Sequence, residues 1–361
     1  SPITISTPLK LVKVRMPAWA VSCSVDGILL VPQEVISENL SIQENDLWQV
    51  VDWFLVVFLI LEGWHERVWE ARNGPIHSYS SHLKGWDERV WQRAWVNRIA
   101  LFLRSWAAQC QGISVEALFG ALPRSKILMT HDVDAIEKTL PIRLKQGAFF
   151  VINATRAFMR GDLKEGIQRT RKVARLMFGQ ENWCNFDELL AAEKSADILS
   201  IFHFHADPRG KTLKRWLFDP GYDIKAEQIR VLMKQLRNNQ HQIGLHPGFE
   251  SWEDKNSIAQ QKKALEEVSE TPVVACRQHW LRFSWQKTWS AQESVGLRSD
   301  TTLMFNDRPG FRNASALRWQ PWNPSRQSSH ELEALPSVLM DSHLYDYQQL
   351  NDSERQEQIS L

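Results

Sequence analysis

The sequence predicts an α/β protein built from two domains. Its 361 residues exceed the roughly 100–200 residues of one typical domain. From about residue 123, short apolar runs alternate with amphipathic segments, as expected for strands alternating with helices. Several of these runs end in polar motifs, as strands do at the active sites of parallel α/β folds. We expect a smaller mixed α/β domain over residues 1–122 and a catalytic α/β domain over residues 123–350.

Composition excludes several classes of protein. Hydrophobic residues make up 43% and charged residues 24% of the chain, as in globular proteins. The formal net charge of +1 gives no electrostatic reason to expect nucleic acid or an anionic membrane as a partner. The four cysteines lie far apart without a C-x-x-C pair, which argues against a disulfide framework and against a thiolate zinc site.

No transmembrane segment is predicted. The longest apolar run, residues 53–61, is far shorter than the roughly 20 residues that span a bilayer, so a buried helix or strand is expected there. No signal peptide is visible, which favours a cytoplasmic location. The chain begins with Ser1-Pro2 rather than Met, and a removed segment would be compatible with this start.

The first domain is expected to begin with strands over residues 8–32 and to continue with helices rich in tryptophan. Residues 63–69 recur in similar form as residues 85–91, but two copies are too few for a solenoid. Trp91 and Trp95 are one helical turn apart, which favours packing in a core. Stacking on sugar rings is the functional alternative for such tryptophans.

The second domain shows both strand and helix patterns. Ile229, Leu232, Met233 and Leu236 form one apolar helical stripe, and Ile258, Leu265 and Val268 mark a helix that ends before Pro272. A basic surface helix is expected over residues 160–178. The predicted strands are residues 127–130, 198–205, 242–245, 273–276, 297–299 and 338–340.

Three motifs follow predicted strands. Asp132 and Asp134 lie two residues apart on an extended segment, so one carboxylate can ligate a metal while the other takes a proton from water. His246 precedes Pro247 and Gly248 on a constrained turn, and neutral imidazole is a common metal ligand. Arg277 follows a third strand and can hold a carboxylate through a bidentate pair. Each motif alone is also compatible with a structural role.

In this order and spacing, the three motifs resemble the polysaccharide deacetylase family, also called the NodB-homology family or carbohydrate esterase family four. The segments Thr130-His131-Asp132-Val133-Asp134, His246 and Arg277 match its motifs, and residues 300–303 and 335–343 resemble later ones. The longer strings GLHPG, RQHWLRF and DTTLMFNDRPGFR are similar to a bacterial branch with an additional N-terminal domain.

The resemblance implies a distorted (β/α) barrel and a set of roles. Asp132 would be the general base and Arg277 would hold it, while His343 would be the general acid, with Asp341 as the alternative. Asp134 and His246 would bind a divalent metal, zinc before cobalt or manganese. The family's usual second ligand histidine is replaced by Glu250, which is either a third ligand or a solvent-facing residue. His203 and His205 are competing sources of ligands, although buried structural histidines are the default expectation.

The predicted function is therefore metal-dependent hydrolysis of an amide, most simply removal of an N-acetyl group from a sugar or a surface-polysaccharide precursor. The expected partner is an N-acetylated carbohydrate, and nucleic acid is not expected. Two alternatives stay open: a non-catalytic glycan-binding protein on the same fold, and a hydrolase of a non-sugar amide.

Overall fold

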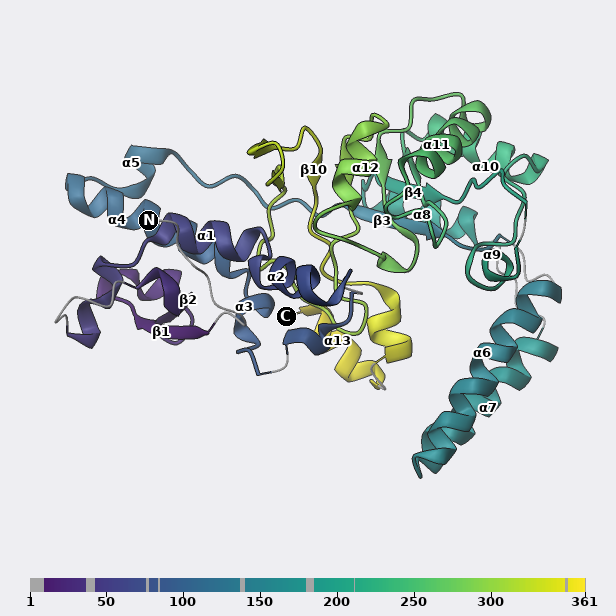
Figure 1. The fold of residues 1–361 in the computed structure, drawn as a ribbon, viewed down its shortest axis with the longest axis horizontal. Helices are drawn as coiled ribbons and strands as arrows, with labels where there is room; N and C mark the ends of the chain where they lie inside the picture. The colour runs from purple at the N-terminus through teal and green to yellow at the C-terminus, as the bar shows by residue number, and fades with distance from the viewer. Residues whose placement is uncertain are drawn as a thin grey trace. The chain divides into compact units, whose positions relative to one another are not determined.

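Figure 1 shows the fold as a computed structural model, whose contacts divide the chain into two units. Unit 1 combines Ser1–Lys126 with Glu250–Ile258 and Val274–Leu361, and unit 2 combines Ile127–Phe249 with Ala259–Val273. The N-terminal region therefore shares a unit with the C-terminal part of the chain. The structure describes residues 10–36, 43–75, 78–83, 85–136, 140–179, 185–210, 212–347 and 350–360.

Unit 2 is built on parallel strands. β4 pairs with β3 on one side and with β5 on the other, and all five β4 residues are buried, as expected for a strand covered on both faces. The helix α11 (Lys255–Ser269) begins in unit 1 and ends in unit 2. The other elements are β3 (Met129–Val133), α6 (Leu140–Met159), α7 (Leu163–Phe178), α8 (Phe186–Ser195), β4 (Ser200–Phe204), α9 (Leu213–Phe218), α10 (Glu227–Asn238) and β5 (Gln242–Leu245).

The N-terminal part of unit 1 pairs β1 with β2 in antiparallel fashion and adds a layer of helices. Its apolar core contains Trp53, Trp95 and Phe102 together with Phe305 from the C-terminal part. The elements are β1 (Leu11–Arg15), β2 (Ile28–Pro32), α1 (Trp53–Leu61), α2 (Trp64–Asn73), α3 (Arg89–Gln92), α4 (Trp95–Gln111) and α5 (Val115–Phe119), with 3₁₀ turns at Ala18–Cys23, Gln33–Val35, Glu44–Gln49 and Ser80–Leu83.

The C-terminal part of unit 1 has short strands. β7 pairs in parallel with both β6 and β10, while β8 and β9 form a small antiparallel ribbon. The elements are β6 (Ala275–Cys276), a 3₁₀ turn at His279–Leu281, α12 (Thr288–Ser294), β7 (Ser299–Asp300), β8 (Trp322–Asn323), β9 (Ser328–Ser329), β10 (Glu333–Ala334), a helical turn at His343–Tyr347 and α13 (Asp352–Ser360).

The α/β class and the parallel pairing are confirmed, and several details differ from the sequence predictions. The strand predicted at residues 127–130 is Met129–Val133, so Asp132 lies within it. Residues 8–32 contain a 3₁₀ turn between their two strands, Ala18–Cys23. The strand predicted at residues 338–340 is wrong, because the Val338 carbonyl accepts a hydrogen bond from Gly310 at 2.9 Å and the pairing with β7 occurs earlier, at Glu333–Ala334. The long apolar run forms α1, and among the described residues no helix combines the length and apolarity needed to cross a bilayer.

Candidate active site

The carboxyl ends of two strands in unit 2 bring Asp134 and His246 together. Asp134 follows β3 directly and His246 follows β5 directly, and parallel strands end at the same edge of a sheet. The Nε2 atom of His246 lies 3.6 Å from Oδ1 of Asp134, and the His246 side chain is buried while the carboxylate faces solvent. Two donors on one tetrahedral zinc lie roughly 3.4 Å apart, so the pair fits a shared metal ion.

Asp132 lies beside a different histidine. In the register of β3 and β4, Asp132 is opposite His203, and Nδ1 of the fully buried imidazole lies 3.4 Å from Oδ1 of the carboxylate. Gly244 of β5 makes room for this imidazole, because a Cβ atom there would come within 2.6 Å of the ring. The burial expected for His203 is confirmed. Its position next to the predicted base lets it orient the Asp132 carboxylate.

The turn that carries His246 is fixed through its backbone. The Gly248 amide donates to Oε1 of Gln261 at 2.8 Å, and the Phe249 amide donates to Oδ1 of Asp219 at 2.7 Å. Nδ1 of His205 donates to the carbonyl of His246 at 3.2 Å. Because both ends of the turn are held, the His246 ring is positioned by several hydrogen bonds rather than by the strand alone.

Tyr222 adds a phenol near the two aspartates. Its hydroxyl accepts a hydrogen bond from the His205 amide at 2.7 Å. Burial raises the pKa of the Tyr222 phenol, and the charges of Asp134 and Asp132 raise it further. The phenol therefore keeps its proton at neutral pH and remains able to donate a hydrogen bond.

A charged pair stabilises the wall behind this turn. Asp207 accepts hydrogen bonds from its neighbour Arg209, from Nε at 2.7 Å and from Nη2. Burial alone would raise the pKa of Asp207, but these bonds and the attraction of Arg209 leave it below its ordinary value. A Cβ atom on Gly248 would lie 3.2 Å from Oδ2 of Asp219, so glycine permits the close approach of the turn to that carboxylate.

His131, the second residue of the first motif, points away from Asp132. Successive strand residues alternate in direction, and Nε2 of His131 lies 2.7 Å from Oε1 of Glu193 on α8. The same carboxylate accepts a hydrogen bond from the Ser200 hydroxyl. His131 thus attaches α8 to the strands.

Arg277 lies in unit 1, directly after β6, and contacts the segment that follows β7. Its Nε donates to the carbonyl and the hydroxyl of Thr301 at 3.2 and 3.1 Å, and its Nη2 donates to the Ser337 hydroxyl at 3.1 Å. The preceding residue, Asp300, is fully buried and accepts from Thr302, Gln292 and Trp289. Burial raises the pKa of this carboxyl. The motif of residues 300–303 therefore fixes the Arg277 side chain.

His343 is bonded to the backbone through both ring nitrogens. Nδ1 accepts from the Met340 amide at 3.3 Å, and Nε2 donates to the Phe305 carbonyl at 3.0 Å. Burial lowers the pKa of this imidazole, which keeps it neutral at pH 7. These contacts favour a role in bracing the two segments.

Glu250 is exposed and lies in the electrostatic field of Arg282. Burial lowers the pKa of Arg282, and the negative charges of Glu250 and Glu253 partly offset that effect. The negative charge of Glu250 therefore acts on the partly buried Arg282 of the same unit.

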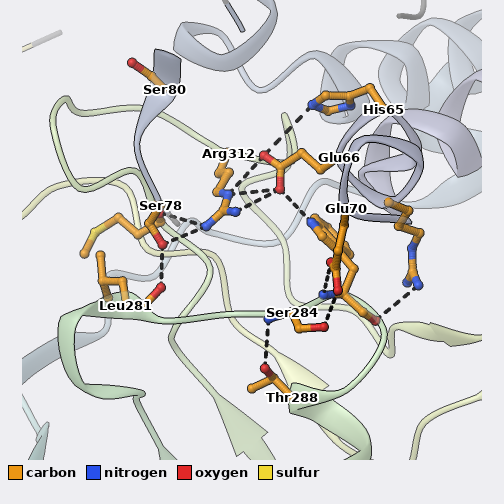
Figure 2. Close-up of polar contacts among 12 residues, drawn as sticks. His65, Glu66, Glu70, Ser78, Ser80, Leu281, Ser284, Thr288 and Arg312 are labelled. Atoms are coloured by element: carbon orange, nitrogen blue, oxygen red, sulfur yellow. Dashed lines mark hydrogen bonds and ion pairs between the residues drawn. The ribbon is translucent and has the colours of Figure 1, made fainter. Parts of the chain in front are cut away.

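The segment that follows the third motif is held by a buried polar network from α2 (Figure 2). Nη2 of Arg312 donates to Oε2 of Glu66 at 2.9 Å, and both side chains are completely buried. The indole of Trp285 donates to the same oxygen at 2.6 Å. One turn along α2, Glu70 accepts from the Ser284 hydroxyl and from the Trp285 amide. The N-terminal helix thus fixes the backbone at residues 284–285.

Unit 2 therefore brings together three predicted residues, Asp132, Asp134 and His246. The other three, Arg277, Glu250 and His343, lie in unit 1, each with the contacts given above. Tyr222 was not predicted as a site residue, and His203 was predicted to be structural. A histidine on the strand next to the D-x-D motif was the available signal for His203, whereas Tyr222 lies in a loop with no recognisable motif.

Comparison with known proteins adds little. No family model matches the chain, and no curated protein matches it. Among solved structures, it is similar to the crystal structure of a "putative polysaccharide deacetylase from Mycobacterium smegmatis", with 18% identity and a TM-score of 0.35. That match covers 60% of this chain and 61% of the other. A likeness this weak carries no argument about activity.

Proposed function

We propose that this protein is a metal-dependent hydrolase that removes an acyl group from an amide, with an N-acetylated carbohydrate as the substrate. The observation that carries the proposal is the pairing of Asp134 with His246 at 3.6 Å, next to a second carboxylate, Asp132, beside a buried imidazole. Metal-dependent hydrolysis of an unactivated amide needs ligands for the metal, here a carboxylate and an imidazole, and a neighbouring general base. We also propose that the parallel strands belong to a distorted (β/α) barrel of the NodB-homology type.

Asp134 and His246 would hold the divalent metal, with zinc as the first choice and cobalt or manganese as alternatives. The metal would supply Lewis acidity toward the amide carbonyl. Glu250, which the sequence pattern leaves as either a third ligand or a solvent-facing residue, is the candidate for the third position.

The chain's own residues would handle the proton and the orientation of the reacting groups. Asp132 would take a proton from the attacking water, and the adjacent His203 would keep its carboxylate aimed. The Tyr222 phenol, protonated at neutral pH, would donate a hydrogen bond toward developing negative charge. Arg277 would add positive charge near the base, as the resemblance implies, and Asp341, the predicted alternative to His343, would return a proton to the leaving amine.

The test is release of acetate from a panel of N-acetylated amino sugars and their oligomers. We expect turnover by the parent, loss on chelation, recovery with zinc, and a fall of at least about 100-fold in Asp132→Asn with unchanged circular dichroism. Undiminished turnover in Asp132→Asn would remove Asp132 from the base role. Glycan binding that survives metal removal, with no turnover on any substrate, would instead support the non-catalytic binding protein.

A further inference from the structure

The helical hairpin of unit 2, formed by α6 and α7, packs through small residues. Figure 1 shows the two helices side by side, and they contact each other extensively. Of its five buried residues among those described, four are glycine or alanine and the fifth is Leu176, and a Cβ atom on Gly166 would come within 2.4 Å of the Phe158 ring. In a helix pair of a water-soluble protein, large apolar side chains normally fill such a seam.

Seven large apolar side chains of the hairpin face outward in two stripes. On α6 they recur at intervals of seven and eight residues, and on α7 at intervals of four and eleven, spacings that place side chains on one face of a helix. At the tip, Met159 is 82% exposed and Leu163 is 65% exposed. The stripes consist of Leu144, Val151, Ile152 and Met159 on α6, and of Leu163, Ile167 and Phe178 on α7.

The hairpin is also strongly basic. Residues 140–178 contain nine Lys or Arg residues but only two Asp or Glu residues. Their net charge is therefore +7, in a chain whose total net charge is +1. On α7 the exposed side chains of Lys164, Arg171 and Arg175 recur at intervals of seven and four residues, on the flank of the apolar stripe. An exposed apolar stripe bordered by cations is the pattern of helices that lie in a membrane interface.

We propose that the hairpin docks on the surface of a bilayer containing anionic phospholipid. The apolar stripes would enter the boundary between headgroups and acyl chains, and the flanking cations would contact the headgroups. Charge complementarity favours the anionic bilayer over a second copy of the chain, because a second copy would place two hairpins with a net charge of +7 each against one another. The outward apolar stripes select it over a water-soluble polyanion, which would leave them in water.

Co-sedimentation of the full chain with vesicles tests the proposal. One set contains equal parts of phosphatidylglycerol and phosphatidylcholine, and the other phosphatidylcholine alone. We expect binding to the first set at low salt, much weaker binding to the second, and release from the first as sodium chloride rises, because screening weakens the headgroup attraction.

Two hairpin variants separate the two contributions. The triple substitution Arg156→Gln, Arg160→Gln and Lys164→Gln should weaken binding on the order of 100-fold, since each cation near an anionic surface changes the affinity roughly five-fold. The pair Met159→Ser and Leu163→Ser should weaken binding at least about ten-fold without changing the charge. Each variant has a matched control at exposed positions of the same unit. The control for the charge variant is the triple substitution Lys225→Gln, Arg230→Gln and Lys234→Gln. The control for the apolar variant is Leu213→Ser with Val231→Ser.

Three results would overturn the proposal. The first is no binding to the anionic vesicles, or binding that the hairpin variants and the controls reduce equally. The second is a concentration-dependent dimer, seen by analytical ultracentrifugation, that disappears in Met159→Ser with Leu163→Ser, which would identify a second copy as the occupant. The third is binding to polyphosphate as tight as to vesicles and insensitive to the same pair of substitutions, which would identify a soluble polyanion.

Discussion

The two ring nitrogens of His343 decide which role this residue can take. A general acid must present a proton to the leaving group, but Nε2 of His343 already donates to the Phe305 carbonyl and Nδ1 accepts from the Met340 amide. The lowered pKa of the buried imidazole makes the charged form scarce at neutral pH. To act as an acid, His343 would have to break one of these bonds and move.

His343→Gln tests the bracing role. Glutamine carries one acceptor and one donor and can preserve part of both backbone contacts. We expect turnover within about five-fold of the parent and a loss of stability of about 1–2 kcal/mol in urea unfolding. A fall in turnover of at least about 100-fold with unchanged stability would restore His343 as the acid.

At the scale of single residues, the sequence predicted the aspartates and His246 but not their companions. Asp132, Asp134 and His246 stand in short motifs next to strands that the pattern of apolar residues reveals. The contact between His203 and Asp132 depends on the register of two strands far apart in the sequence. Nothing local to either residue specifies that register, so the pairing becomes visible only in the fold.

Among the secondary-structure elements, α2 shows how the N-terminal region supports the third motif. Its carboxylates Glu66 and Glu70 bind Arg312 and the backbone at Trp285, all buried. A buried ion pair gains little over a well-packed apolar pair, but removing one partner leaves an uncompensated charge. The network therefore makes the placement of residues 284–285 sensitive to single substitutions in α2.

Glu66→Gln should lower the free energy of unfolding by about 3–5 kcal/mol, because Arg312 remains buried without its counter-charge. The double variant Glu66→Gln with Arg312→Met should recover much of this loss. The matched control is Glu88→Gln. Glu88 forms an exposed ion pair with Arg308 at 3.2 Å, so this substitution should lower the free energy of unfolding by less than about 1 kcal/mol. Equal losses in Glu66→Gln and Glu88→Gln, measured by urea unfolding, would contradict the importance of the buried network.

Elements whose apolar residues follow a clear sequence pattern were predicted well, whereas elements that depend on contacts between distant parts of the chain were not. The four apolar residues of the predicted stripe on α10 are all buried, and β5 has the predicted bounds. The apolar residues 338–340 were predicted as a strand, yet their neighbours in space are loops, and β-pairing goes to Glu333–Ala334. Short apolar runs do not reveal which partner strand is available.

For the whole molecule, the net charge of the chain does not show how unevenly the charges are distributed. A net charge of +1 gave no reason to expect an anionic surface as a partner, yet residues 140–178 alone carry +7. The division into units was also not predicted from the sequence. Residues 1–126 share unit 1 with Val274–Leu361, and this long-range packing has no local signal in the sequence.

The measurement that tests the central claim most directly is elemental analysis of the purified protein after incubation with zinc, cobalt or manganese and removal of excess metal. We predict about one equivalent of metal in the parent and in the control Asp187→Ala, and almost none in folded Asp134→Ala and His246→Ala. An undiminished equivalent in those two variants, or no metal in the parent with any of the three ions, would contradict the proposed metal centre.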